Sequence, residues 1–138
     1  MNILVDTSVW SLALRRRSGA GSDHPYVVEL AELIRDGRVA MLGPIRQELL
    51  SGIRVAADFE RLRGHLRDFP DTPVFAADYE RAAEHFNSCR AKGVQGSNTD
   101  FLICAIAERH RLPIFTTDDD FRSFARVLPI QLHVPVLH

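Results

Sequence analysis

Five short segments of the chain are almost wholly apolar, and each is bounded by polar residues. They are rich in valine, isoleucine, leucine and phenylalanine. A continuous apolar run is typical of a strand in a parallel sheet whose two faces are both covered. We therefore predict strands at residues 2–6, 39–42, 73–75, 113–116 and 130–134.

Between these segments, apolar residues recur at the three- and four-residue spacing of an amphipathic helix. Residues 101–107 are apolar almost all round, which predicts a central, buried helix. Its N-cap is expected at Ser97, Asn98 or Thr99. A first helix is expected at residues 9–17. Four further helices are expected from their apolar stripes, which are Val27, Leu30, Ala31 and Ile34 in the first of them, Ile45, Leu49 and Ile53 in the second, Phe59, Leu62, Leu66 and Phe69 in the third, and Tyr79, Ala82, Ala83 and Phe86 in the fourth.

Short strands that alternate with helices indicate right-handed β-α-β units. The expected fold is of the α/β class, a three-layer α/β/α sandwich around a central parallel sheet of four or five strands. The length of 138 residues and the apolar content of 46% suit one domain, residues 1–138, with its own hydrophobic core. Residues 15–25 hold two glycines and three arginines and are expected to form an exposed loop.

Several protein classes are excluded by composition. No apolar run approaches the ~20 residues of a membrane helix, and the chain enters its first predicted strand directly after Met1 and Asn2, without a visible signal segment. Cys89 and Cys104 have neither metal-ligand nor redox spacing, so we expect reduced core residues of a cytoplasmic protein rather than a disulfide. The six histidines show no zinc-type spacing, and no pair of them indicates a general base.

The net charge of −1 gives no bulk basicity of the kind that marks many nucleic-acid binders. The cations are nevertheless unevenly chosen, because Lys92 is the only lysine beside sixteen arginines. Arginine grips phosphate with a planar fork, which suits RNA. A GC-rich parent genome accounts for the same bias, and it is the simpler explanation.

Four acids stand where predicted elements meet. Asp6 closes the first apolar run, and Asp118 follows the strand at 113–116. Asp100 opens the apolar helix, and Glu48 lies at the border of the apolar face of its own helix. Ligands of open α/β sheets bind at the carboxyl ends of the strands. Carboxylates brought together there repel one another unless a cation joins them, and a hard divalent ion with oxygen ligands fits that need.

Each acid also has a structural explanation. Asp6 or Ser8 is placed to cap the helix that follows, and Asp100 suits the positive end of a helix dipole. For Glu48 the structural explanation is a solvated helix charge, although ordinary surface glutamates lie opposite the apolar stripe. None of these explanations accounts for all four acids together.

The successive aspartates Asp118, Asp119 and Asp120 cannot all face one site, and a turn after a strand tolerates all three as solvated caps. Asp118 is favoured as the metal ligand because it is nearest the strand end. Asp120 is spaced to point the same way.

Four motifs in this order, Val5-Asp-Thr-Ser-Val-Trp10, Glu48-Leu-Leu-Ser-Gly-Ile53, Asn98-Thr-Asp-Phe-Leu-Ile-Cys-Ala105 and Thr116-Thr-Asp-Asp-Asp-Phe121, resemble those of the PIN domain of VapC-type toxins. The likeness covers nearly the whole chain. It implies an α/β/α endoribonuclease that uses Mg²⁺ or Mn²⁺ and leaves a 5′-phosphate and a 3′-hydroxyl. By motif, the catalytic acids are Asp6, Glu48, Asp100 and Asp118, the metal ligands are Asp6, Asp100 and Asp118, and the supporting residues are Thr7, Ser8, Thr116 and Asp120.

The resemblance also implies partners: an RNA substrate, a cognate VapB-like antitoxin whose tail blocks the site, and a second copy of the chain in a homodimer. Two other functions compete with this one. A receiver-like phospho-switch module also places acids at strand ends, but it needs paired acids after the first strand and a lysine near the last, and here Asp6 stands alone. A catalytically inactive PIN-like scaffold that only binds RNA or protein is the other alternative.

Overall fold

The centre of the molecule is a small parallel sheet. The computed structural model describes residues 1–16 and 24–136. In spatial order the strands are β2 (Val39–Ala40), β1 (Ile3–Val5) and β3 (Ile114–Phe115). β1 pairs in parallel with both neighbours, so that Leu4 lies opposite Ala40 on one side and Ile114 on the other. All three residues of β1 are buried, as the continuous apolar run predicts.

The sheet has three strands rather than the predicted four or five, and a single bridge extends it at each edge. Residues 73–75 form no strand; on that edge the bridge is Met41 with Asp71. On the other edge, only Leu132 of the predicted strand at 130–134 bridges to β3. Prolines at positions 70, 73, 129 and 135 flank these bridges. Because proline has no N–H to donate, neither segment extends its ladder.

Helices account for most of the described chain. α6 confirms the predicted buried helix, and its N-cap is Ser97. The predicted loop at 15–25 falls largely on residues 17–23, which lie outside the described residues. The helices are α1 (Thr7–Arg16), α2 (Pro25–Arg35), α3 (Gly43–Leu50), α4 (Ala56–Leu66), α5 (Ala76–Ala91), α6 (Asn98–His110) and α7 (Asp120–Ala125).

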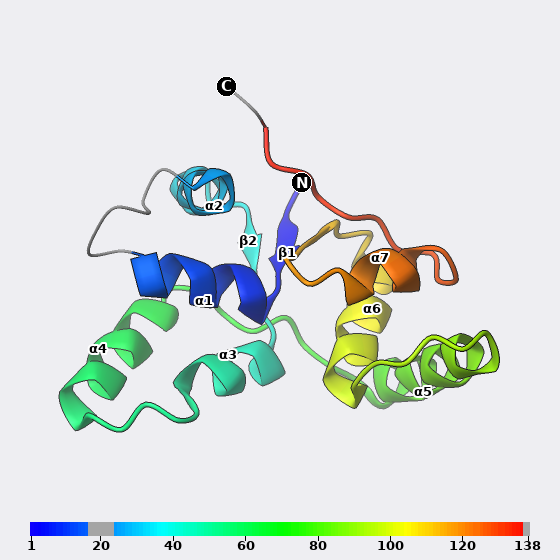
Figure 1. Ribbon diagram of the computed structural model, residues 1–138. Coiled ribbons are helices and arrows are strands. Elements are labelled where there is room, and N and C mark those ends of the chain that lie inside the picture. The colour runs from blue at the N-terminus through cyan, green and yellow to red at the C-terminus, as the bar shows by residue number, and fades with distance from the viewer. Residues whose placement is uncertain (17–23, 137–138) are drawn as a thin grey trace.

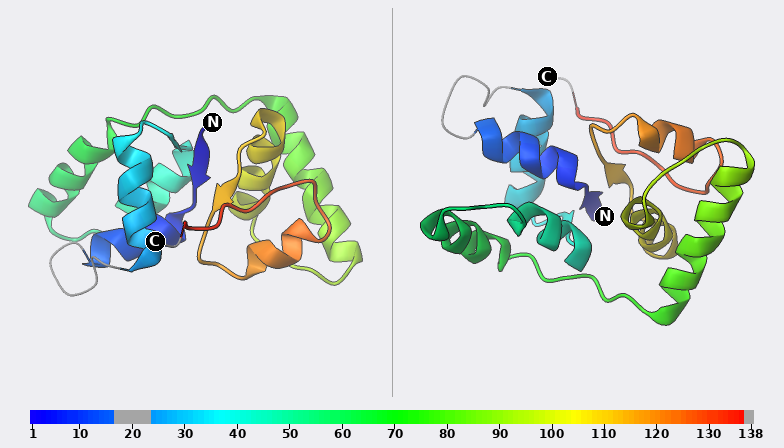
Figure 2. Two further views of the ribbon diagram at one scale, coloured as in Figure 1. Left: turned by 90° about the horizontal axis from the view of Figure 1, so that it is seen from above. Right: turned by 60° about the horizontal axis from the view of Figure 1, so that its bottom comes forward.

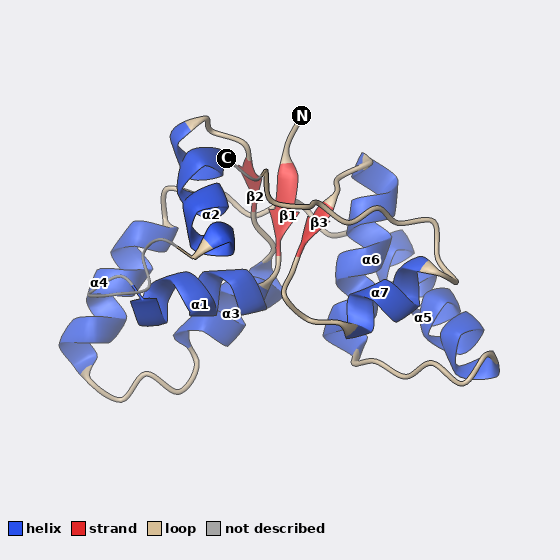
Figure 3. Cartoon of the chain, turned by 45° about the horizontal axis from the view of Figure 1, so that its top comes forward, coloured by secondary structure: helices blue, strands red, loops and turns tan. Residues whose placement is uncertain are grey.

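The helices flank the sheet in two groups (Figure 1). α1 to α4 lie on one side of the strands, and α5 to α7 lie on the other. Figure 2 and Figure 3 show the same division from other directions. The expected α/β/α arrangement is therefore confirmed, and the buried apolar side chains of both groups belong to one hydrophobic cluster around β1.

α5 and α6 form the most closely joined helix pair. Arg109 of α6 binds Asp78 through two hydrogen bonds of 2.7 and 2.9 Å, and Asp78 is buried. The preceding residue of α6, Glu108, accepts from Arg81 at 2.9 Å and contacts the buried ring of His85 at 2.9 Å. Asp78, the buried carboxylate of this set, is therefore paired across the two helices, as a buried charge must be.

The apolar stripe predicted on α5 is only partly buried. α5 turns Ala82, His85 and Cys89 toward the core, and Tyr79 stays 58% exposed. Cys104 of α6 is also a buried free thiol, which confirms the prediction of core cysteines. Burial raises the pKa of both thiols, and an un-ionised thiol is a poor nucleophile. In the described part of the chain, no helix is long and apolar enough to cross a membrane.

Candidate active site

Asp6 lies at the carboxyl end of the middle strand, directly before α1. Its side chain is almost buried, with 7% of the residue exposed. Two hydroxyls donate to its Oδ2, Ser8 Oγ at 2.8 Å and Thr116 Oγ1 at 2.8 Å. The backbone N–H of Ser8 adds a longer bond of 3.4 Å to the same oxygen. Asp6 thus has the local cap bond predicted as an alternative, together with a contact to a distant strand.

The end of β3 supplies the second part of the site. Thr116 follows β3, and because β3 is the neighbour of β1, its hydroxyl reaches Asp6. The same hydroxyl accepts from the N–H of Asp118 at 3.0 Å, and Ser8 Oγ accepts from the N–H of Thr117 at 3.0 Å. The turn after β3 is therefore folded around these two hydroxyls. Asp118 Oδ1 in turn accepts from the N–H of Asp120 at 2.9 Å.

The three successive aspartates differ in their surroundings. Asp118 is half-buried, whereas Asp119 and Asp120 are exposed. The side chain of Asp119 faces solvent beside Arg122, at 3.7 Å. Asp120 contributes its backbone N–H to the site. This environment favours Asp118 as the acid of the triplet that faces the other carboxylates.

Asp100 belongs to the first turn of α6. Its Oδ2 accepts from the N–H of Ser97 at 3.2 Å, and its own N–H donates to Ser97 Oγ at 3.1 Å. Burial raises the pKa of the Asp100 carboxyl above its usual value, and the negative charges of Asp6 and Asp118 raise it further, against the hydrogen bonds from Ser97. The carboxylates of Asp6 and Asp118 therefore lie close enough to Asp100 for their charges to act on it.

Glu48 reaches the site through a different contact. It is exposed on α3, and its Oε1 accepts from the hydroxyl of Thr7 at 2.9 Å. Thr7 follows Asp6 directly, so this bond ties α3 to the start of α1. The structure thus brings Asp6, Asp100 and Asp118 together. Glu48 lies at their border, bound to Thr7, the residue that follows Asp6.

One pattern is common to all four acids. Each has one carboxylate oxygen held by a donor of the chain: a hydroxyl for Asp6 and Glu48, and a backbone N–H for Asp100 and Asp118. None of these bonds uses the second oxygen. The donors of Asp6 and Glu48 are the hydroxyls expected at Ser8, Thr116 and Thr7. The backbone N–H of Ser97 was not predicted as part of the site, although the spacing Ser-x-x-Asp before an apolar run is the signal of a capping box.

The donor set has the chemistry of a site for a hard cation. It consists of carboxylate and hydroxyl oxygens, and Mg²⁺ prefers one or two carboxylates together with retained waters and substrate phosphates. Across residues 1–16 and 24–136, no three or more Asp, Glu, His or Cys side chains are arranged to hold a metal ion. The charges of Asp6 and Asp118 nevertheless act on Asp100, since both raise the pKa of its carboxyl. By type, these oxygen donors suit an ion most of whose ligands are waters and phosphate.

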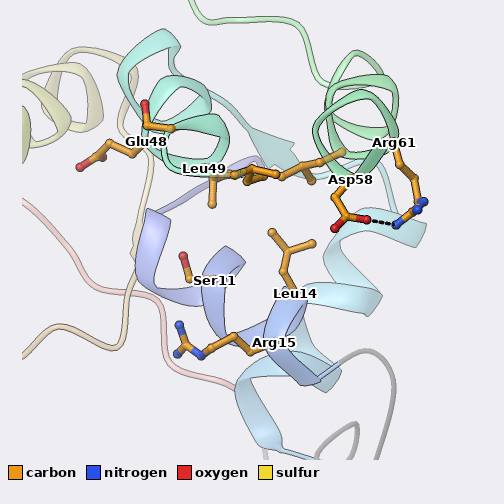
Figure 4. Close-up of a pocket in the computed structure, with 10 residues that line it drawn as sticks. Ser11, Leu14, Arg15, Glu48, Leu49, Asp58 and Arg61 are labelled. Atoms are coloured by element: carbon orange, nitrogen blue, oxygen red, sulfur yellow. Dashed lines mark hydrogen bonds and ion pairs between the residues drawn. The ribbon is translucent and has the colours of Figure 1, made fainter. Parts of the chain in front are cut away.

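A groove runs alongside the site between α1, α3 and α4 (Figure 4). Its volume is about 430 Å³, and Glu48 lies at one end of it. Apolar side chains such as Leu14 and Leu49 line the groove, and the ion pair of Asp58 with Arg61 closes its far side. The sequence pattern did not indicate this groove, because its walls come from three helices whose packing no local motif specifies.

Comparisons with known proteins agree with this architecture. The sequence profile of the PIN domain matches residues 3–127. No curated protein sequence matches the chain significantly.

Similar solved structures include FitAcB from Neisseria gonorrhoeae, with 22% identity, a TM-score of 0.74, and coverage of 96% of this chain and 97% of that chain. VapBC2 from Rickettsia felis bound to a DNA fragment from its promoter has 18% identity, a TM-score of 0.76, and coverage of 96% and 98%. FitAB bound to an IR36 DNA fragment has 19% identity, a TM-score of 0.72, and coverage of 99% of each chain. At these identities the likeness establishes the fold, and the profile match establishes the family. The chain belongs to the PIN domain family.

Proposed function

We propose that this protein is a metal-dependent endoribonuclease that hydrolyses phosphodiester bonds of RNA. The observation that carries this proposal is the group of three carboxylates, Asp6, Asp100 and Asp118, gathered at the ends of two neighbouring strands and the start of α6. In each of these carboxylates, one oxygen accepts a hydrogen bond from a donor of the same chain. Membership of the PIN domain family supports the same reaction class and gives no support to a receiver-like module.

Mg²⁺ is the proposed cofactor, with Mn²⁺ as an alternative, and Asp6, Asp100 and Asp118 are its proposed ligands. Held by these three carboxylates, such an ion would make an attacking water more acidic and would offset the negative charge that develops on the phosphate. Glu48 is proposed to orient the water or to contribute at the border of the site. Ser8 and Thr116 keep Asp6 in one rotamer by binding its Oδ2, and Thr7 does the same for Glu48.

We further propose that the chain is the toxin of a VapBC-type toxin–antitoxin module, acting as one PIN domain in the cytoplasm. Two of the similar solved structures are VapBC2 and FitAB, each bound to a DNA fragment. The groove between α1, α3 and α4 supports a VapB-like antitoxin as partner. It combines an apolar floor with charged rims and ends at Glu48, so that a segment seated in it reaches the border of the acids.

A homodimer is proposed as the assembly. Tyr79 of α5 is 58% exposed, and Phe75, the N-cap of the same helix, is also 58% exposed. A second hollow of about 470 Å³, lined by Tyr79, Pro44 and Leu102 among others, lies between α3, α5 and α6. Such exposed aromatic surface is typical of an interface. Light scattering at micromolar concentration tests it, and a clean monomer contradicts the dimer.

RNA cleavage tests the proposed activity. Purified wild-type protein and the Asp100→Asn variant are incubated with total cellular RNA, with EDTA or with added Mg²⁺, and the cut ends are mapped. The proposal expects cuts only with wild type and Mg²⁺, each with a 5′-phosphate. Equal cleavage by the variant or in chelator contradicts it, and RNA binding without any cleavage identifies an inactive scaffold.

A further inference from the structure

The first turn of α6 joins Ser97 and Asp100 through two reciprocal hydrogen bonds. The N–H of Ser97 donates to Asp100 Oδ2 at 3.2 Å, and the N–H of Asp100 donates to Ser97 Oγ at 3.1 Å. In a capping box, these bonds satisfy two N–H groups that the helix leaves unpaired. The carboxylate of Asp100 also belongs to the candidate metal site, where the charges of Asp6 and Asp118 act on it.

We propose that the backbone amide of Ser97 is a positioning group for Asp100, which holds this carboxylate in the orientation that binds the divalent cation. This inference rests on the proposed function. Once Oδ2 is bound to Ser97, the two side-chain torsions of Asp100 are fixed, and Oδ1 is the oxygen left for a cation. Asp100 then binds through one oxygen, and its cap bond persists in the metal-bound protein.

A backbone donor suits this task better than a side-chain donor. Its direction is set by the fold of the turn, so the donor itself loses no rotamer freedom when it binds the carboxylate. Ser97 is itself exposed, and its N–H and hydroxyl both bind Asp100 rather than Asp6 or Asp118. Any effect that Ser97 has on the site therefore passes through Asp100.

Two substitutions at Ser97 separate the amide from the hydroxyl. Ser97→Ala removes the hydroxyl and keeps the N–H, whereas Ser97→Pro removes both. The backbone of Ser97, at φ −83° and ψ 162°, is within reach of proline. The preceding residue is Gly96, the residue type that best tolerates the restriction that a following proline imposes.

The readouts are Mn²⁺ affinity by electron paramagnetic resonance titration, the thermal midpoint, and KM and kcat for RNA. We expect Ser97→Ala to bind Mn²⁺ within about twofold of wild type and Ser97→Pro to bind it about tenfold more weakly, since groups that orient metal ligands are worth about 10–100-fold in metal affinity. A merely structural cap predicts lower thermal midpoints with equal Mn²⁺ affinities. Equal affinity of the two folded variants overturns the inference.

A measurement on the wild type covers the case in which Ser97→Pro does not fold. Hydrogen exchange of the Ser97 amide is followed by NMR before and after Mg²⁺ is added. We expect the amide to stay protected in Mg²⁺, because Oδ2 keeps its bond while Oδ1 binds the ion. Loss of protection on metal binding overturns the inference.

The outcomes also separate this inference from the proposed function. If the wild type neither binds Mn²⁺ nor cleaves RNA, the proposed function fails and the inference fails with it. If the wild type does both, and the two Ser97 variants bind Mn²⁺ equally or the amide loses protection in Mg²⁺, the inference alone fails.

Discussion

The hydroxyl of Thr116 donates to Oδ2 of Asp6 at 2.8 Å, although the two residues are 110 positions apart in the chain. The bond joins the ends of the middle strand and its neighbour, and the same hydroxyl accepts from the N–H of Asp118 at 3.0 Å. One threonine thus connects two of the proposed metal ligands. A carboxylate as buried as Asp6 needs such donors, because an ionised group without them is costly to bury.

Thr116→Val tests this connection, since valine keeps the shape of threonine and removes the hydroxyl. We predict a loss of about 1–3 kcal/mol in the free energy of unfolding, because Asp6 and the N–H of Asp118 both lose a partner. Thr116→Ser is the matched control and should stay near wild type in stability and cleavage. Urea denaturation measures the difference, and a valine variant as stable as the serine variant contradicts the role of the hydroxyl.

Asp6→Asn is predicted to reduce RNA cleavage by at least about a hundredfold, because the ion supplies several kcal/mol of transition-state stabilisation. The circular-dichroism melt should change little, since the amide oxygen of asparagine still accepts from Ser8 and Thr116. Retention of wild-type activity would reject Asp6 as an essential ligand.

The raised pKa of Asp100 predicts a stability effect with a definite sign. Between the ordinary pKa of aspartate and the raised value, the unfolded chain releases this proton while the folded chain keeps it. Stability from this group is therefore present at low pH and is lost as pH rises through the folded pKa. In chelator at neutral pH, Asp100→Asn should melt a few degrees above wild type, and the gap should close below about pH 3.8. A variant that melts lower at neutral pH contradicts the proposed repulsion.

Asp78 has the opposite behaviour. The hydrogen bonds from Arg109 hold the pKa of the Asp78 carboxyl below its usual value, against the effect of burial. Its contribution to stability is present above the ordinary pKa of aspartate and is lost as pH falls through the lowered value. Arg109→Met leaves a buried carboxylate without its partner, and we predict a loss of about 1–3 kcal/mol. Arg122→Met is the surface control, because within residues 1–16 and 24–136 the ion pair of Arg122 is with the exposed Asp119. Equal losses in the two variants would contradict the role of burial.

The sequence predicted the parts of the molecule that local patterns control. The apolar runs located β1, β2 and β3, and the run after Asp100 located the buried helix α6. The predictions of outer strands at residues 73–75 and 130–134 were wrong. Strand pairing depends on the neighbouring strand and on proline, which removes hydrogen-bond donors at both edges of the sheet. Tyr79 was predicted on the apolar stripe of its helix, yet it is 58% exposed. A stripe shows that a helix is amphipathic, but it does not show which other element packs against each of its residues.

The same division holds for the candidate site. Motif order proposed Asp6, Asp100 and Asp118, and the charges of Asp6 and Asp118 raise the pKa of the Asp100 carboxyl. The hydrogen bond from Thr7 to Glu48 and the groove beside it depend on how α1, α3 and α4 pack. The choice among the three successive aspartates likewise needed their burial, since their spacing alone does not distinguish them.

The central claim is that three carboxylates share one divalent cation. Crystals soaked in Mn²⁺ and measured near the manganese absorption edge test it most directly, because the anomalous signal locates the metal itself. We predict one strong peak in contact with Asp6, Asp100 and Asp118, and no such peak in Asp6→Asn crystals soaked in the same way. Manganese bound only at other carboxylates, or an equal peak in the variant, would contradict the claim.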